Sequence, residues 1–157
     1  GMNIVDARIS PLDNGYSLDT YVFMELDKRI EIDDSRLDKI RRTLTRVLAL
    51  DDDNVTNVTR RAPRQVRMFP TKTSVDFGRA MTRGKTVLEL VTGDRPGLLS
   101  KVGKAFIAEG IDIETAKIVT IGERAEDVFY ISKESGEPLG DSDKEQLRNA
   151  LIESLSN

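Results

Sequence analysis

The stretch VTGDRPGLLSKVGKAFIAEGIDI, residues 91–113, contains the change of periodicity that decides the fold. Just before it, in residues 85–92, apolar and polar side chains alternate with the period of two that is typical of a strand. After Pro96 the period becomes helical. The apolar face of the predicted helix is formed by Leu98, Val102 and Phe106. Pro96 suits the first helical turn, and Gly110 suits the left-handed position that ends a helix.

The residues that follow predict two more strands and a last helix. The strands cover residues 111–121 and 124–133, and a tight turn at Gly122 joins them. Asp141 or Ser142 can cap the helix. Residues 85–157 therefore read strand, helix, strand, strand, helix. This is the α+β, ferredoxin-like order without its final strand, with an antiparallel sheet and helices on one face.

An internal repeat relates the start of the chain to this second half. NIVDARIS at 3–10 matches DIETAKIV at 112–119, at an offset of 113 − 4 = 109 residues. Further matches lie within two residues of that offset. The matched pairs are Ala7 with Ala116, Arg8 with Lys117, Ile9 with Ile118, Asp19 with Asp127, Tyr21 with Phe129, Phe23 with Ile131, Leu44 with Leu151 and Leu48 with Leu155.

The repeat predicts two domains, of which the first is truncated. Residues 1–84 form the first copy, which lacks a counterpart of residues 86–112, and residues 85–157 form the second. We therefore expect the chain to be a fragment of a longer protein. Residues 64–77 read as a long strand that would close the sheet of the first copy. The alternatives are that this strand is drawn towards the sheet of the second copy or that two chains exchange it. In the predicted helix, Gly103 would let a neighbouring element pack closely.

Composition excludes several kinds of function. The 157 residues include 38% hydrophobic and 32% charged residues, carry a net charge of −3 and contain neither cysteine nor histidine. No Ser-His or Cys-His arrangement is possible, and we predict no catalytic residue, no metal site and no cofactor. The charge gives no general attraction to nucleic acid. We expect a cytoplasmic protein that binds neither nucleic acid nor membrane. The arginine-rich run at 60–67 reads most simply as a solvated strand and linker.

The turn Gly93-Asp94-Arg95-Pro96-Gly97 is the candidate binding site. Backbone N–H groups at a helix start favour a carboxylate or phosphate, and Asp94 can accept from an ammonium group. Together these groups suit a zwitterion such as a free amino acid. The alternative is that Asp94 only caps the helix and that nothing binds. Asp112 either faces a ligand across the turn or simply starts a strand.

The motif DRPGLL, between an LEL strand and a GIDI strand, is similar to the signature of ACT domains. Three longer strings resemble the C-terminal tandem ACT region of bacterial protein-PII uridylyltransferases. They are RR-P-RQV-R-FPTKTSVDF at 60–77, AKIVTIGERAEDVFYI at 116–131 and NIVDARI at 3–9. The resemblance covers essentially the whole chain.

The resemblance implies a regulatory fragment that senses glutamine and shifts a parent enzyme between uridylylation and deuridylylation of the PII nitrogen-signalling protein. The catalytic domains would lie upstream, and the partners would be PII, those domains and, in a homo-oligomer, further copies of the chain. Carried over by motif, the ligand-binding residues are Asp94, Arg95, Pro96, Gly97, Leu98, Asp112 and Ile113. The alternative is an ACT-type dimerisation module without a small-molecule ligand.

Overall fold

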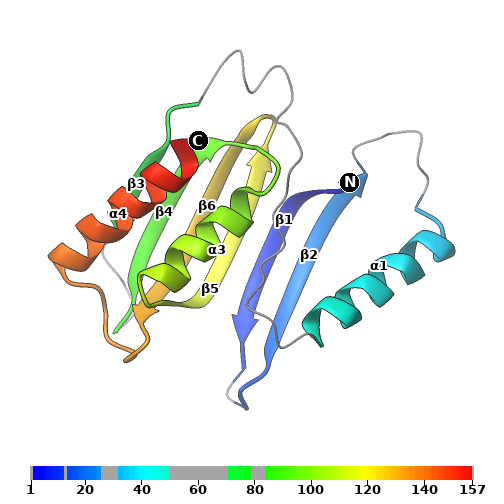
Figure 1. Cartoon of the computed structure of the whole chain (residues 1–157), viewed down its shortest axis with the longest axis horizontal. Helices are drawn as coiled ribbons and strands as arrows, with labels where there is room; N and C mark the ends of the chain where they lie inside the picture. Colours follow the sequence, from blue (N-terminus) through cyan, green and yellow to red (C-terminus); the bar gives the residue numbers. More distant parts are fainter. Residues whose placement is uncertain (1, 13, 26–31, 50–70, 79–83, 157) are drawn as a thin grey trace.

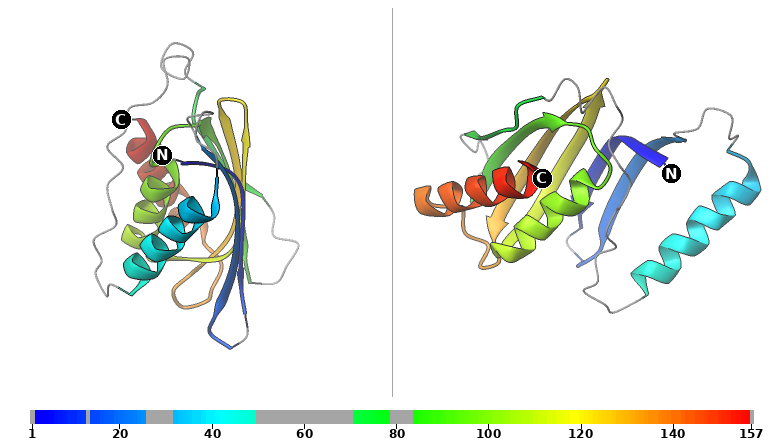
Figure 2. Two further views of the ribbon diagram at one scale, coloured as in Figure 1. Left: turned by 90° about the vertical axis from the view of Figure 1, so that its right-hand side faces the viewer. Right: turned by 45° about the horizontal axis from the view of Figure 1, so that its top comes forward.

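One antiparallel sheet with helices on one face organises the protein (Figures 1 and 2). The computed structural model describes residues 2–12, 14–25, 32–49, 71–78 and 84–156. The strands are β1 (Met2–Pro11), β2 (Ser17–Glu25), β3 (Ser74–Gly78), β4 (Thr86–Gly93), β5 (Ile111–Ile121) and β6 (Arg124–Lys133). The helices are α1 (Asp34–Leu48), α3 (Leu98–Ala108) and α4 (Asp141–Ser156). The strand order β2-β1-β5-β6-β4-β3 confirms the predicted α+β, ferredoxin-like class.

The core lies between α3, α4 and the half of the sheet formed by β5, β6, β4 and β3. The leucines of α4 are fully buried, as are the predicted apolar positions of α3. At the centre, the rings of Phe106 and Phe129 meet edge to face with centroids 5.2 Å apart. Each fully buried side chain of this size contributes about 1.5–3 kcal/mol, so this face holds the second unit together.

The start of α3 differs from the prediction. Pro96 lies in a turn before the helix, and the residue that precedes the first helical residue is Gly97. Gly97 has φ 81°, a left-handed conformation that glycine adopts without steric cost. The chain therefore makes a tight turn at Gly97 before the helix begins. At the other end Gly110 has φ 63°, the left-handed position that the sequence predicts.

β3 takes the second of the places that the sequence leaves open. It pairs with β4, from Ser74 opposite Val91 to Gly78 opposite Val87, and so lies beside the second unit instead of closing the first. The order β5-β6-β4-β3 is that of a complete four-stranded ferredoxin-like sheet. β4 would otherwise be an unpaired edge, and β3 buries Val75 there. Residues 64–70 of the predicted strand lie outside the described residues.

The first unit consists of β1, β2 and α1, and the matched residues are far more exposed than in the second unit. Tyr21 is 46% exposed where Phe129 is 2%, and Leu44 is 56% exposed where Leu151 is fully buried. α1, capped by the Asp33 carboxylate, buries none of its side chains. In the second unit these positions are covered by β4 and α3, for which the described part of the first unit has no counterpart.

β1 joins the two units by pairing with β5. In this pairing Ala7 lies opposite Ile118, and Ile9 lies opposite Ala116. Because the repeat equates Ala7 with Ala116 and Ile9 with Ile118, the contact is self-complementary. An approximate twofold axis passes through the pair Arg8 and Lys117, as in the isologous interface of a homodimer.

The predicted close packing at Gly103 is wrong, and this gives a stability test. A Cβ added at Gly103 would meet nothing within 4 Å. Gly103→Ala should therefore stabilise the fold by about 0.5–1 kcal/mol, because alanine loses less backbone entropy in a helix interior. Urea unfolding measures the change. Gly110→Ala is the matched control and should destabilise, because its left-handed φ strains a residue with a side chain. A destabilised Gly103→Ala would contradict the open space beside this helix.

Candidate functional site

The turn between β4 and α3 is tied to the hairpin between β5 and β6. The Asp94 N–H donates to the Glu123 carbonyl at 2.8 Å, which continues the pairing of β4 with β6 beyond Gly93. Two residues before Asp94, on β4, the Thr92 hydroxyl lies 2.8 Å from the Thr73 hydroxyl. The turn is therefore held from two sides before the chain enters the helix.

The N-cap residue of α3 is a glycine. Gly97 makes no side-chain cap hydrogen bond, and the backbone bonds run from Leu98 N–H to the Arg95 carbonyl at 3.1 Å and from Lys101 N–H to the Gly97 carbonyl at 3.0 Å. Capping by Asp94 stays the alternative prediction for this turn. The helix start carries a partial positive charge.

Two buried polar atoms of opposite charge type lie at this end of the second unit. Among the described residues, Arg95 Nε and Asp127 Oδ2 are buried without a hydrogen-bond partner. Asp127 is 1% exposed, and its other oxygen, Oδ1, accepts from the Val119 N–H at 3.3 Å. Buried polar atoms are paired in the great majority of cases, so two orphans at one site call for an explanation.

The environment of Asp127 disfavours its charged form. Burial raises the pKa of the Asp127 carboxyl to about 7, the hydrogen bond from Val119 acts in the opposite direction, and the charge of Asp94 raises it further. Asp127 lies on β6 opposite Leu90 of β4. The carboxyl group is therefore titratable near neutral pH and senses charge in the turn.

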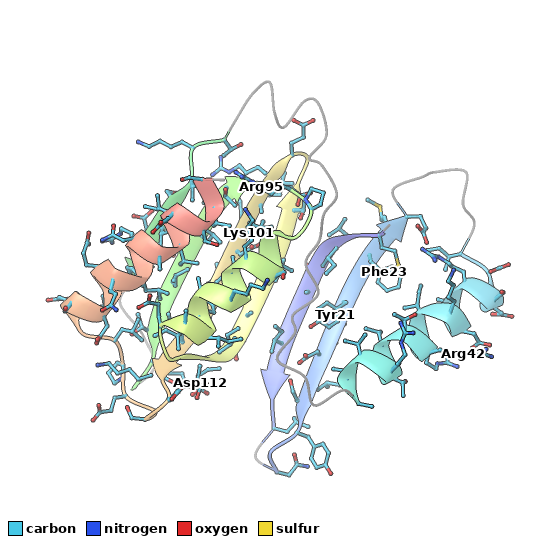
Figure 3. All side chains as sticks on the ribbon, in the orientation of Figure 1. Tyr21, Phe23, Arg42, Arg95, Lys101 and Asp112 are labelled. Atoms are coloured by element: carbon cyan, nitrogen blue, oxygen red, sulfur yellow. The ribbon has the colours of Figure 1, made fainter. Side chains whose placement is uncertain are left out.

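The structure separates the two parts of the predicted site. Asp94 to Leu98 lie together at the start of α3, whereas Asp112 and Ile113 follow its end, on β5 opposite Ser132 and Ile131. The 11 residues of α3 span about 16 Å, and Figure 3 shows Arg95 and Asp112 at opposite ends of the sheet. Within one chain the turn and Asp112 do not form a common site.

Near Asp112 lies a shallow pocket of ≈ 200 Å³, lined by residues from the end of α3, the end of β6 and the start of α4. Its rim carries the ion pair between Lys133 Nζ and Asp143 Oδ2, at 2.6 Å. The lysine and the carboxylate already satisfy each other. Two of the charged groups on the rim of this pocket are therefore already paired, whereas the buried Arg95 Nε in the turn is not.

Asp127 is the residue that the analysis of single motifs overlooks. Alternation along 124–133 puts it on the same inward face as Ala125, Phe129 and Ile131, all of them buried. A charged residue at an inward position of a strand was the signal that could have revealed it. The arginine-rich run at 60–67 lies outside the described residues. Of the described helices, none has the length and apolarity to cross a membrane.

The raised pKa of Asp127 predicts how stability depends on pH. The folded protein holds this proton up to about pH 7, whereas an unfolded aspartate releases it near 3.8. The free energy of unfolding should therefore fall as pH rises from 4 to 7, by up to about 4 kcal/mol from this group. Asp127→Asn keeps the acceptor for Val119 and cannot ionise. Its stability relative to the wild type should rise by that amount from pH 4 to 7 in urea titrations, and parallel curves would contradict the assignment.

No protein-family model matches the chain, but curated relatives do. It is 40% identical over 157 residues to a "Bifunctional uridylyltransferase/uridylyl-removing enzyme" of Pseudomonas fluorescens, and 42% identical over 156 residues to the protein of that name in Vibrio campbellii. The match covers 99% and 98% of this chain and 17% of each relative, so the chain spans about one sixth of their length. The predicted resemblance is thereby confirmed: this chain matches a C-terminal region of bifunctional uridylyltransferase/uridylyl-removing enzymes.

Proposed function

We propose that this chain is a glutamine-sensing regulatory region of a protein-PII uridylyltransferase, acting on the balance between uridylylation and deuridylylation of PII. Similarity over nearly its whole length to uridylyltransferase/uridylyl-removing enzymes supports the parent activity. The chemistry of the turn before α3 supports an amino-acid ligand. The parent enzyme, its catalytic domains, PII and a cytoplasmic location are parts of this proposal.

The observation that carries the proposal is the buried Arg95 Nε in the turn before α3. The start of α3 and the Arg95 guanidinium are suited to an α-carboxylate, since Arg95 Nε is buried without an acceptor. The Asp94 carboxylate is suited to an ammonium group. Pro96, Gly97 and Leu98 complete the ligand set as the residues that shape the turn. A zwitterion satisfies both charge types at once.

A binding module without a small-molecule ligand is the second candidate. The self-complementary pairing of β1 with β5 favours it, because the contact has the form of a dimer interface within one chain. In that case the turn would contribute to packing only. Titration with glutamine separates the two candidates.

Isothermal calorimetry of the chain with glutamine should give a saturable isotherm. Asp94→Ala should weaken the binding by about 1–3 kcal/mol, because the ammonium group would lose a charged partner. Absence of heat for the wild type across millimolar glutamine would favour the module without a ligand. Unchanged affinity in Asp94→Ala would remove this residue from the site.

Asp112→Ala is the matched control and tests the other part of the predicted site. Asp112 is exposed and lies at the far end of α3, so this variant should bind glutamine as the wild type does. Weakened binding would instead mean that Asp112 and Ile113 meet the turn of another chain. The sequence prediction for those two residues would then hold across an interface.

We further propose that the chain forms a homo-oligomer. The exposed apolar side chains of α1 and β2 match buried ones in the second unit, and such surfaces recruit other chains (Figure 3). Light scattering at micromolar concentration should give at least twice 17.5 kDa. Leu44→Lys, in the exposed face of α1, should shift the mass towards the monomer.

Ile107→Lys is the control for that shift. Ile107 is also exposed, but it lies on α3, whose inward face is already packed. This variant should keep the oligomeric mass. A wild-type chain that scatters as a well-folded monomer would show that the first unit is stable without a partner.

A further inference from the structure

Asp127 is a buried acidic group to which the resemblance assigns no role. Its Oδ2 is buried without a partner, on a side chain that is 1% exposed. It lies on the same face of β6 as the buried Phe129 and opposite Leu90 of β4, four residues before Asp94. The Asp94 N–H donates to the Glu123 carbonyl at the end of the same strand pair. The charge of Asp94 contributes to the raised pKa of Asp127. A structural carboxyl in such a place normally has both oxygens paired. The unpaired oxygen indicates a missing donor.

We propose that Asp94 and Asp127 together form an acidic pair that receives the ammonium group of a free amino acid, with Asp94 in the turn and Asp127 beneath it. This inference rests on the proposed amino-acid function and adds a residue to its site. An ammonium group has three N–H donors, so it can bond to both carboxyls at once. Its positive charge also relieves the repulsion between them.

The first unit supplies an internal comparison. Asp19, which the repeat matches to Asp127, pairs with Ile9 in the regular ladder, and its exposed carboxylate accepts from the hydroxyls of Ser17 and Tyr21. Asp127 also lies in a regular ladder, opposite Leu90, but its Oδ1 accepts from the Val119 N–H and its Oδ2 has no partner. The two aspartates differ because α3 covers this face of the sheet in the second unit. In the described part of the first unit no counterpart of α3 covers Asp19. The exposed Asp19 thus has partners for both carboxylate oxygens, whereas the buried Asp127 has a partner for only one.

Ligand binding should therefore be coupled to a proton. Near pH 7 about half of the free protein carries a proton on Asp127, and a bound ammonium group favours the charged carboxylate. Binding should release about half a proton at pH 7 and tighten about tenfold from pH 6 to pH 8. A free amino acid keeps its ammonium charge over this range, so the slope belongs to the protein.

The charged residues on the elements next to Asp127 are Asp94 and Arg95 in the turn, Lys101 and Lys104 on α3, Lys117 on β5, and Glu123, Arg124 and Glu126 at the hairpin. Arg124 and Glu126 alternate with Asp127 along β6 and so lie on the opposite face of the sheet. Within this group Asp94 is the residue whose charge contributes to the raised pKa of Asp127. Arg124 and Glu126 already form an ion pair at 2.9 Å. Asp94 and Asp127 are therefore the pair to test together.

The experiment is calorimetry with three probes in two buffers, PIPES and imidazole, at pH 6, 7 and 8. The buffers differ in ionisation enthalpy, so the difference in heat counts the protons released. Glutamine should bind with the expected release and pH slope. Glutaramate, which is glutamine without its ammonium group, should bind at least tenfold more weakly and release no proton. Ammonium chloride tests whether the ion alone occupies the pair, and we expect no saturable binding at millimolar concentration.

Asp127→Asn should weaken glutamine binding about tenfold or more at pH 8 and abolish the pH slope. Asn keeps an acceptor for Val119, so a merely structural role would leave affinity and slope as they are. The matched control is Asp19→Asn, which changes the equivalent exposed residue and should bind like the wild type. If Asp127→Asn does not fold, the proton count of the wild type decides the matter, and a count of zero at pH 7 overturns the proposal.

The outcomes separate this inference from the proposed function. Glutamine binding without proton release, or equal binding of glutaramate, overturns the acidic pair and leaves amino-acid sensing intact. Saturable binding of ammonium chloride with the same release would assign the pair to the free ion and overturn an amino acid as its ligand. Failure of the wild type to bind glutamine or any other free amino acid removes both proposals.

Discussion

The pairing of β1 with β5 is the contact on which the rest of the structure depends. Four residue pairs, from Asp6 with Val119 to Ile9 with Ala116, join two half-sheets into one. Without them β1 and β2 would form an isolated two-stranded hairpin, which is marginally stable at best in water. Ala7 and Ala116 are completely buried in this pairing. Larger side chains at these two positions would push the sheet away from α3.

The same pairing places two equivalent units in unequal surroundings. Each unit presents an aromatic residue opposite its buried alanine, Tyr21 opposite Ala7 and Phe129 opposite Ala116. Phe129 then packs against Phe106, while Tyr21 stays partly exposed. The matched aromatic residues of the two units therefore differ in how much of each side chain is exposed to solvent. The candidate site exists in the second unit because β4, its turn and α3 cover the strand that carries Asp127.

Local patterns predicted the parts of the fold that depend on neighbours in sequence. The bounds of β5 and β6, the turn at Gly122 and the buried leucines of α4 follow from alternation, glycine and helical spacing. The place of β3 stayed open between the two sheets, because the choice of an edge strand depends on which distant edge is free. The start of α3 was placed too early, because a left-handed Gly97 before the helix leaves no mark in the periodicity.

The candidate site shows the same division. The turn was found from its motif, since Asp94 to Leu98 are consecutive, but Asp112 was attached to it although a helix of about 16 Å lies between them. Asp127 is 33 residues beyond Asp94 (127 − 94 = 33), and only the pairing of β6 with β4 brings it opposite Leu90, four residues before Asp94. The sequence alone shows only that a charged residue occupies an inward position of a strand. The pairing of the strands shows which residues lie beside it.

An unpaired buried carboxyl lowers the stability of the folded protein, and a chain of this size has little stability to spare. An asparagine at position 127 would keep the bond from Val119 without carrying a charge, so packing alone does not require an acid there. What an acid adds is the ability to change charge near pH 7 when a cation arrives. In the uncovered unit, Asp19 has neither the burial nor the orphan oxygen. The destabilising group thus lies in the unit whose turn we propose to bind an amino acid, and a bound ammonium group would compensate for it.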